Sequence, residues 1–107
     1  MATEVELKKQ RTQLRRQLTI AMNKTNECLV DPTADGYKLT LKAMASILKP
    51  KATQLEDIDN RYILFCDDED AITKETTEAA RCQMDCYLCL AEIEAALEKT
   101  SGATSTR

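Results

Sequence analysis

The sequence predicts an all-α protein, an elongated antiparallel three-helix bundle with coiled-coil-like packing. Its 107 residues include two glycines, two prolines and 4% aromatic residues, too few turn-forming residues for a fold of many short strands. Apolar residues recur every three or four positions in three long stretches, which is the spacing of a buried helix face. The length fits one domain, which we expect to span residues 1–98.

The first helix is predicted to begin near Thr3 and to end near Val30. Thr3 and Glu6 have the spacing of a capping box, in which each side chain accepts a hydrogen bond from an otherwise unsatisfied backbone N–H. The apolar stripe that follows consists of Leu7, Leu14, Leu18, Ala21, Met22, Cys28 and Leu29.

The segment DPTADG, residues 31–36, predicts a turn and the start of a second helix. Asp31 or Thr33 is suited to cap that helix, and Pro32 to stand in its first turn. We therefore expect the second helix to begin within this segment.

The middle helix is predicted to be long and kinked near Pro50. Proline in a helix interior costs about 3 kcal/mol, but the apolar stripe keeps its phase across this position, which favours a kink over two separate helices. The stripe consists of Tyr37, Leu41, Met44, Leu48, Ala52, Leu55, Ile58, Tyr62 and Phe65, and the apolar residues Leu39, Ile47, Ile63 and Leu64 lie beside it.

Four consecutive acids at residues 67–70 predict the turn into a third helix, because negative charge is unfavourable at a helix C-terminus and favourable at an N-terminus. Residues 99–107 are polar and aperiodic, and we expect a disordered tail there. The stripe of the third helix consists of Ile72, Ala79, Cys82, Cys86, Cys89, Leu90, Ile93 and Leu97.

The charge is divided along the chain. Residues 1–54 carry 10 basic and 5 acidic groups, and residues 55–107 carry 5 basic and 13 acidic groups. In the antiparallel arrangement, residues 8–16 (KKQRTQLRR) are expected to lie opposite residues 48–56, forming a basic band beside an acidic tip. This band is either a solvated helix face or a contact surface for RNA or an anionic membrane. Its members are Lys8, Lys9, Arg11, Arg15, Arg16, Lys49 and Lys51.

The five cysteines are an odd number, so a complete disulfide framework is impossible, and we expect reduced thiols and a cytoplasmic location. Cys82, Cys86 and Cys89 share one helix face, which suits either a metal site or a core stripe. The chain has no histidine, and the other two cysteines are expected on the order of 20 Å away. We therefore interpret the trio as core and expect no metal or cofactor.

Residues of the common catalytic types are also sparse. Without histidine there is no Ser-His or Cys-His pair, the two glycines form no phosphate loop, and the acids of residues 67–70 are expected on an exposed turn. No stretch approaches the roughly 20 apolar residues of a membrane-spanning helix. These observations favour a non-enzymatic protein that acts through protein contacts, with no small-molecule substrate.

The segment LKKQRTQLRRQLT, from Leu7 to Thr19, resembles the opening helix of the N-terminal Gag-like region in Bel/Pao-type LTR retrotransposon polyproteins. The likeness is one of helix pattern and covers most of residues 4–98. Where that family tends to carry aromatic residues in its middle and last helices, this chain has Cys82 and Cys86 around Tyr87 and no tryptophan. The resemblance implies a structural segment without activity of its own and with a role in assembly.

Self-association is the expected form of that assembly. A basic band on one copy can face the acidic tip of another, and exposed ion pairs of this kind contribute only about 0–1 kcal/mol each. Apolar burial must supply the rest of the free energy of association. We therefore expect a weak homo-oligomer that salt weakens further, more readily a dimer than an extended chain. The candidate contact residues are Leu39, Ile47, Ile63, Asp67, Asp68 and Asp70.

Overall fold

A computed structural model describes the backbone of residues 3–105 and the side chains of residues 3–99. Along the chain lie α1 (Glu4–Leu29), α2 (Tyr37–Tyr62), a single 3-10 turn η1 (Ile63–Phe65) and α3 (Glu69–Ser105). The described residues contain no strand. The predicted all-α class and the three-helix architecture are confirmed.

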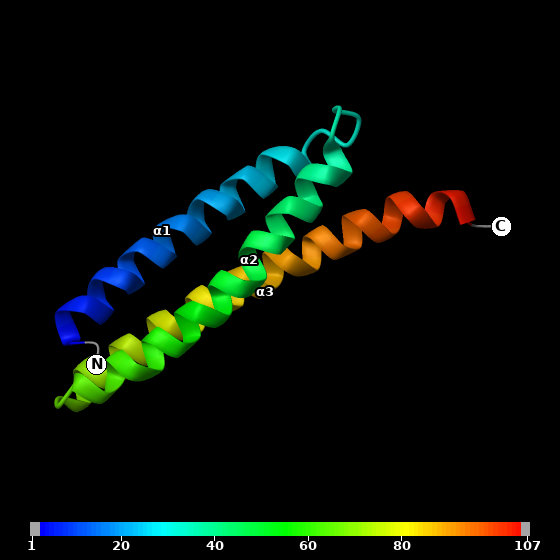
Figure 1. Ribbon diagram of the computed structural model, residues 1–107. Coiled ribbons are helices and arrows are strands. Elements are labelled where there is room, and N and C mark those ends of the chain that lie inside the picture. The colour runs from blue at the N-terminus through cyan, green and yellow to red at the C-terminus, as the bar shows by residue number, and fades with distance from the viewer. Residues whose placement is uncertain (1–2, 106–107) are drawn as a thin grey trace.

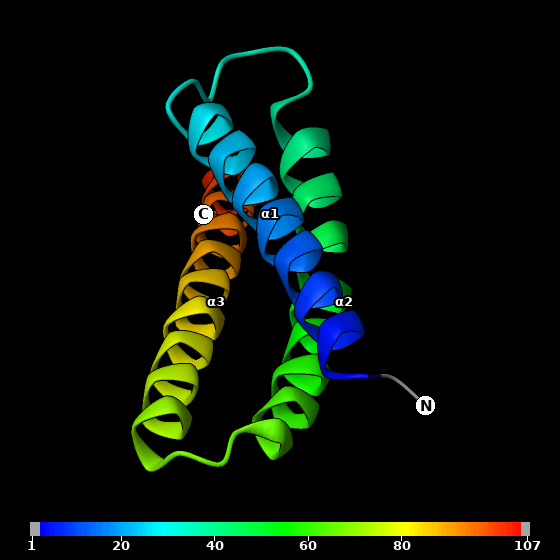
Figure 2. The same cartoon turned by 90° about the vertical axis from the view of Figure 1, so that its left-hand side faces the viewer.

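The three helices alternate in direction and form a rod. Figure 1 shows α1 and α2 as an antiparallel hairpin, with α3 running back along α2. Figure 2 shows α1 in front of the other two helices. The molecule measures 58 × 21 × 21 Å, and α1 and α3 each pack mainly against α2. The middle helix therefore holds the bundle together.

The start of α1 follows the prediction. The Thr3 hydroxyl oxygen accepts a hydrogen bond from the Glu6 backbone N–H at 3.1 Å, and the Glu6 carboxylate accepts one from the Thr3 N–H at 3.4 Å. This capping box satisfies donors that the first helical turn leaves free. Leu7, Leu14 and Leu18 then face the interior, as their spacing predicted.

The start of α2 differs from the prediction. The helix begins at Tyr37 and is preceded by Gly36, whose backbone is left-handed with φ of 78°, and no side chain caps it. Asp31 and Thr33 bond to each other instead, the Thr33 hydroxyl donating to the Asp31 carboxylate at 2.8 Å. The segment from Asp31 to Gly36 is therefore a turn that precedes the helix. Gly36 ends this turn, because glycine adopts positive φ at little cost.

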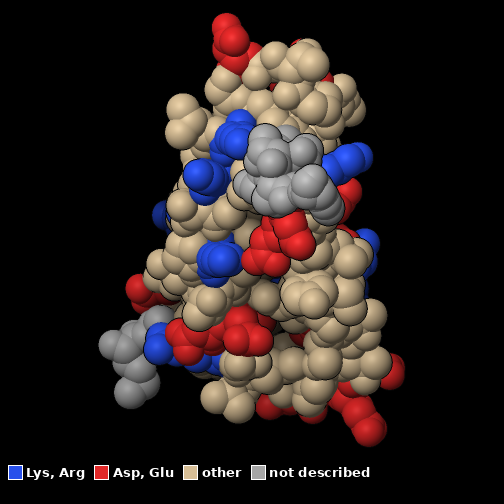
Figure 3. All heavy atoms as spheres, turned by 90° about the vertical axis from the view of Figure 1, so that its right-hand side faces the viewer, with Lys and Arg blue, Asp and Glu red and all other residues tan. Residues whose placement is uncertain are grey.

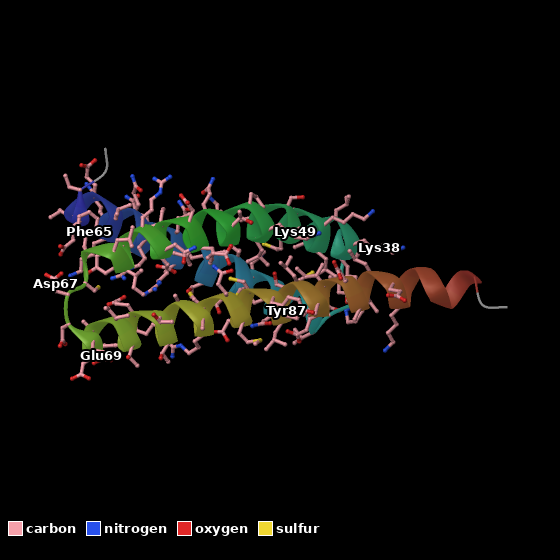
Figure 4. The ribbon with its side chains drawn as sticks, turned by 90° about the horizontal axis from the view of Figure 1, so that it is seen from below. Lys38, Lys49, Phe65, Asp67, Glu69 and Tyr87 are labelled. Carbon is pink, nitrogen blue, oxygen red and sulfur yellow. The ribbon has the colours of Figure 1, made fainter. Side chains whose placement is uncertain are left out.

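The middle helix is continuous through Pro50. It is long, with 26 residues, but shorter than predicted at both ends, because it begins at Tyr37 instead of within residues 31–36 and its last expected turn is the 3-10 turn η1. Figure 4 shows α2 as one slightly bowed helix that is not split. Its inward residues join those of both neighbours in one core of Leu14, Leu18, Ala21, Tyr37, Leu41, Leu48, Ala52, Leu55, Cys86, Cys89 and Ile93.

The acidic turn stands at the start of α3, as predicted. The Asp68 carboxylate accepts a hydrogen bond from the Ala71 N–H at 3.2 Å, and the Asp68 carbonyl accepts one from the Ile72 N–H at 2.9 Å. The α3 backbone is helical to Ser105. The backbone of residues 99–105, where we expected a disordered tail, is thus helical, and residues 106–107 of that tail lie outside the described part.

Two leucines of α2 test the core directly. Leu48 is withdrawn from solvent, whereas Leu39 is 73% exposed. Replacing Leu48 with alanine is expected to lower the free energy of unfolding by about 2–5 kcal/mol, because the lost contacts leave a cavity. The matched Leu39→Ala change is expected to cost under about 0.5 kcal/mol. Urea unfolding followed by circular dichroism measures both, and equal losses would contradict this core.

Candidate functional site

The basic stretch KKQRTQLRR is divided between the interior and the surface. Arg11 is only 8% exposed and forms an ion pair with Glu75 of α3. Its guanidinium also lies over the Tyr62 ring of α2, 4.2 Å from the ring centroid. Arg11 thus joins all three helices through a cation–π contact and an ion pair.

Arg15 lies one turn further along α1 and joins the same three helices. It lies 3.4 Å from the carboxylate of Asp59 on α2 and 3.7 Å from that of Glu78 on α3. Asp59 is 8% exposed, and its burial raises the pKa of its carboxyl group, a shift that the nearby charges of Arg15 and Arg11 oppose. We call Arg11, Arg15, Asp59, Glu75 and Glu78 the arginine cluster.

The arginine cluster is incompletely satisfied. Arg15 Nε and one carboxylate oxygen of Asp59 are buried without a hydrogen-bond partner. A buried ion pair gains little net stability, because removing both charges from water costs about as much as their attraction returns. The cluster therefore bears more on how the helices align than on net stability, since this is the alignment in which Arg11 and Arg15 meet partners on both other helices.

The register between α1 and α2 differs from the prediction. Arg11 and Arg15 lie opposite Tyr62 and Asp59, whereas residues 48–56 were expected there. Lys51 lines a groove with Ile20 and Lys24, more than a turn beyond the basic stretch. The helices are displaced because Arg11 and Arg15 have acidic partners and an aromatic ring at this level of α2 and α3.

The residues of the predicted basic band therefore do not form one surface. Lys8, Lys9 and Arg16 are exposed on α1, while Arg11 is buried and Arg15 is half-buried. Lys49 is exposed and Lys51 half-buried on α2. Figure 4 places Lys49 on the N-terminal half of α2, away from the end where α2 turns into α3. On the face seen in Figure 3, basic and acidic side chains are interspersed.

The predicted self-association residues are also spread out. Leu39 is exposed near the start of α2, Ile47 borders the groove with Ile20, and Ile63 is half-buried in η1. Leu39 and Ile63 are roughly 36 Å apart by helical rise. The exposed acids Asp67, Asp68 and Asp70 lie at the end of the rod where α3 begins (Figure 4). No single patch includes all six of these described residues.

A groove runs between α1 and α2 on the side away from α3. It has a volume of about 360 Å³, in the range of pockets that hold several side chains or a small ligand. Apolar side chains form most of its wall, and two lysines border it. We call it the α1–α2 groove, and it is lined by Gln17, Ile20, Ala21, Lys24, Met44, Ile47 and Lys51.

The outward side of α3 is apolar where a solvated helix would carry charges. Met84, Tyr87 and Leu88 are 55%, 67% and 52% exposed. The alanines one turn before and after them are exposed too, so the stripe continues in both directions. Charged residues such as Asp85 and Glu92 only flank it. We call this stripe the α3 ridge: Ala80, Met84, Tyr87, Leu88, Ala91 and Ala95.

The α3 ridge was missed by the sequence analysis, although the sequence carries its signal. The segment from Gln83 to Leu97 has apolar residues on two opposite sides of the helix. The side that carries the cysteines is the buried one, and the opposite side forms the ridge. A helix that is apolar on two opposite sides is usually covered by other elements on both sides. In this structure α1 and α2 cover only the side of α3 that carries the cysteines.

The cysteines follow the core interpretation. Cys86 and Cys89 are buried in the core, Cys82 is half-buried, and all five thiols are unpaired. Burial raises the pKa of Cys86 to about 11 and also raises the pKa values of Cys82 and Cys89. These thiols therefore stay protonated at neutral pH and are poor nucleophiles.

The part of the chain that the structure describes contains no group of three or more cysteine, aspartate or glutamate residues arranged to hold a metal ion. None of its helices combines the length and the apolar content that crossing a membrane requires.

Comparison with known proteins identifies no relative: no family model, no curated protein and no solved structure matches this chain.

The arginine cluster can be tested with two aspartates of α2. Asp59→Ala is expected to lower the free energy of unfolding by about 3 kcal/mol, because Arg15 would keep its buried place without this partner. Asp57 forms an exposed pair with Arg61 at 3.2 Å, and Asp57→Ala is expected to cost no more than about 1 kcal/mol. Urea unfolding measures both, and similar losses would show that the cluster does not constrain the fold.

The raised thiol pKa values predict a loss of stability at alkaline pH. Cys86 keeps its proton in the folded state up to about pH 11, whereas the unfolded thiol loses it near pH 9. The free energy of unfolding should therefore be unaffected by this group below pH 9 and should fall as pH rises from 9 to 11. Cys86→Ala should make that fall shallower, and an unchanged slope would contradict a buried thiol.

Proposed function

We propose that this chain is a non-enzymatic assembly module that associates with copies of itself. The observation that supports the proposal best is the α3 ridge. Isolated apolar residues are common on protein surfaces, but Met84, Tyr87 and Leu88 are exposed together, with further exposed alanines on the adjoining turns. Tyrosine and methionine are also enriched at protein interfaces.

The size of the ridge indicates weak association. From Ala80 to Ala95 it is about 22 Å long and about 10 Å wide by helix dimensions. Stable interfaces typically bury about 800 Å² on each partner, several times this footprint. Assembly through so small a surface suits a module present in many linked copies, in which many weak contacts act together.

The Gag-like origin belongs to this proposal. It rests on the resemblance of Leu7 to Thr19 to the opening helix of Bel/Pao-type Gag-like regions and on the three-helix pattern that follows. Such a segment would make structural contacts within a retrotransposon polyprotein or a protein derived from one. A cytoplasmic location, in which the five unpaired thiols would stay reduced, is part of the same proposal.

Binding of RNA or an anionic membrane through the first helix is the alternative, and the structure supports it less well. Arg11 and Arg15 are used inside the bundle, so Lys8, Lys9 and Arg16 are the exposed cations that remain on that stretch. Binding of RNA at low salt that disappears when these three are changed to glutamate would favour the alternative.

Self-association is tested by sedimentation equilibrium across protein concentration, at low and at high salt. The average mass of the wild-type chain is expected to rise with concentration. The rise should be smaller at high salt, because salt screens the attraction between basic side chains of one copy and acidic side chains of the other. Tyr87→Glu is expected to weaken the association constant at least tenfold by placing a charge on the ridge.

The matched control is Asn23→Glu, which adds the same charge at an exposed position on α1. It should leave association unchanged. A wild-type chain that stays monomeric at every concentration would refute the proposed function.

A further inference from the structure

The α3 ridge of one copy could be covered by the ridge or by the α1–α2 groove of a second copy. The charges that border the ridge and the groove distinguish these two arrangements. Asp85 and Glu92 flank the ridge on α3, and Glu56 of α2 lines the hollow next to Met84 and Tyr87. Arg81 and, one turn beyond Ala95, Lys99 are exposed cations near this helix face. The ridge is thus an exposed apolar surface with a mostly acidic border, and Ala80, Met84 and Tyr87 also line a hollow of about 540 Å³ between α2 and α3.

The border of the α1–α2 groove carries the opposite charge. Its wall is formed mainly by Ile20, Met44 and Ile47, and the cations at its border are Lys24 and Lys51. Arg16 lies one helical turn before Ile20 and adds another positive charge on that side. The groove is therefore a concave apolar surface with a basic border.

We infer that the α3 ridge of one copy docks into the α1–α2 groove of the next, an inference that rests on the proposed self-association. Tyr87 and its neighbours fill the apolar groove, and the acids around the ridge face the lysines around the groove. Pairing two ridges would leave Asp85, Glu92 and Glu56 of both copies close to one another. Complementary charge favours docking of unlike surfaces and disfavours that like-with-like alternative.

The positions of the two surfaces determine the form of the assembly. The groove opens between α1 and α2, whereas the ridge lies on the side of α3 that faces away from the core. The two surfaces therefore lie on opposite sides of the rod, and each copy can bind one neighbour on each side. A contact of this kind, between different patches, continues into an open chain unless its geometry closes a ring.

This arrangement differs from the one expected from the sequence. From the sequence, the basic band of one copy was expected to face the acidic tip at residues 67–70 of another copy. A dimer was expected more readily than an extended chain. In the structure the acids that border the α3 ridge are those along α3, with Glu56 beside them. Ile47 keeps a role as a wall of the groove, while Leu39 and Ile63 lie outside both surfaces.

Two single variants of the full chain separate the possible assemblies. Ile20→Glu blocks the groove, and Tyr87→Glu blocks the ridge; both positions are more than 60% exposed, so folding should be preserved and is checked by circular dichroism. Each variant alone is expected to associate at least tenfold more weakly than the wild type. Mixed in equal amounts, they are expected to form a dimer of one copy of each that grows no further, because each supplies the surface that the other lacks.

Sedimentation equilibrium of each variant, of the mixture and of the wild type gives the decisive comparison. Wild-type mass that keeps rising beyond a dimer, together with recovery in the mixture, supports ridge-in-groove docking. A wild-type dimer that persists in Ile20→Glu, with no recovery of Tyr87→Glu in the mixture, would show that two ridges pair and would overturn the inference. Wild-type association that neither variant weakens would also overturn it while leaving self-association standing, and a wild-type monomer would end both proposals.

Discussion

Leu41, Leu48 and Leu55 of α2 are completely withdrawn from water, and the bundle depends on their burial. They recur every seven residues, so they lie along one line of the helix and meet both α1 and α3. Burying a leucine side chain contributes roughly 1.5–3 kcal/mol to the free energy of unfolding. A pair of helices alone would leave part of this line of leucines exposed to solvent. The third helix completes the burial, with Cys86 and Ile93 closing the core from the other side.

Apolar packing alone leaves the register of the helices poorly specified, since leucine stripes slide past one another at modest cost. The arginine cluster removes that freedom. Arg11 needs both the ring of Tyr62 and the carboxylate of Glu75, and Arg15 needs Asp59, so a shift by one turn would bury two guanidinium groups without partners. A stretch that is basic in the sequence thus becomes partly a structural element, with Lys8, Lys9 and Arg16 left to the solvent.

Once the core is formed and the register fixed, the α1–α2 groove and the α3 ridge are among the apolar surfaces that remain uncovered. The α1–α2 groove is bordered by lysines and the α3 ridge mostly by acids, so the division of charge along the sequence reappears on opposite sides of the rod. In a monomer this division only influences solubility and steering. Between copies it distinguishes docking of unlike surfaces from docking of like surfaces, and the same helices that build the core then also build the assembly.

The sequence by itself determined the helical class, the capping box at Thr3, the turn at residues 31–36, the continuity of the middle helix through Pro50 and the burial of Cys86 and Cys89. Each of these depends on interactions within a few residues or on one periodic stripe, and such signals are local. The alignment of α1 with α2, the interior place of Arg11 and Arg15 and the exposure of the α3 ridge were decided only by the tertiary structure. They depend on which residues of distant helices meet, and the free energy of a buried charge is set by its partners across the bundle, not by its neighbours in the chain.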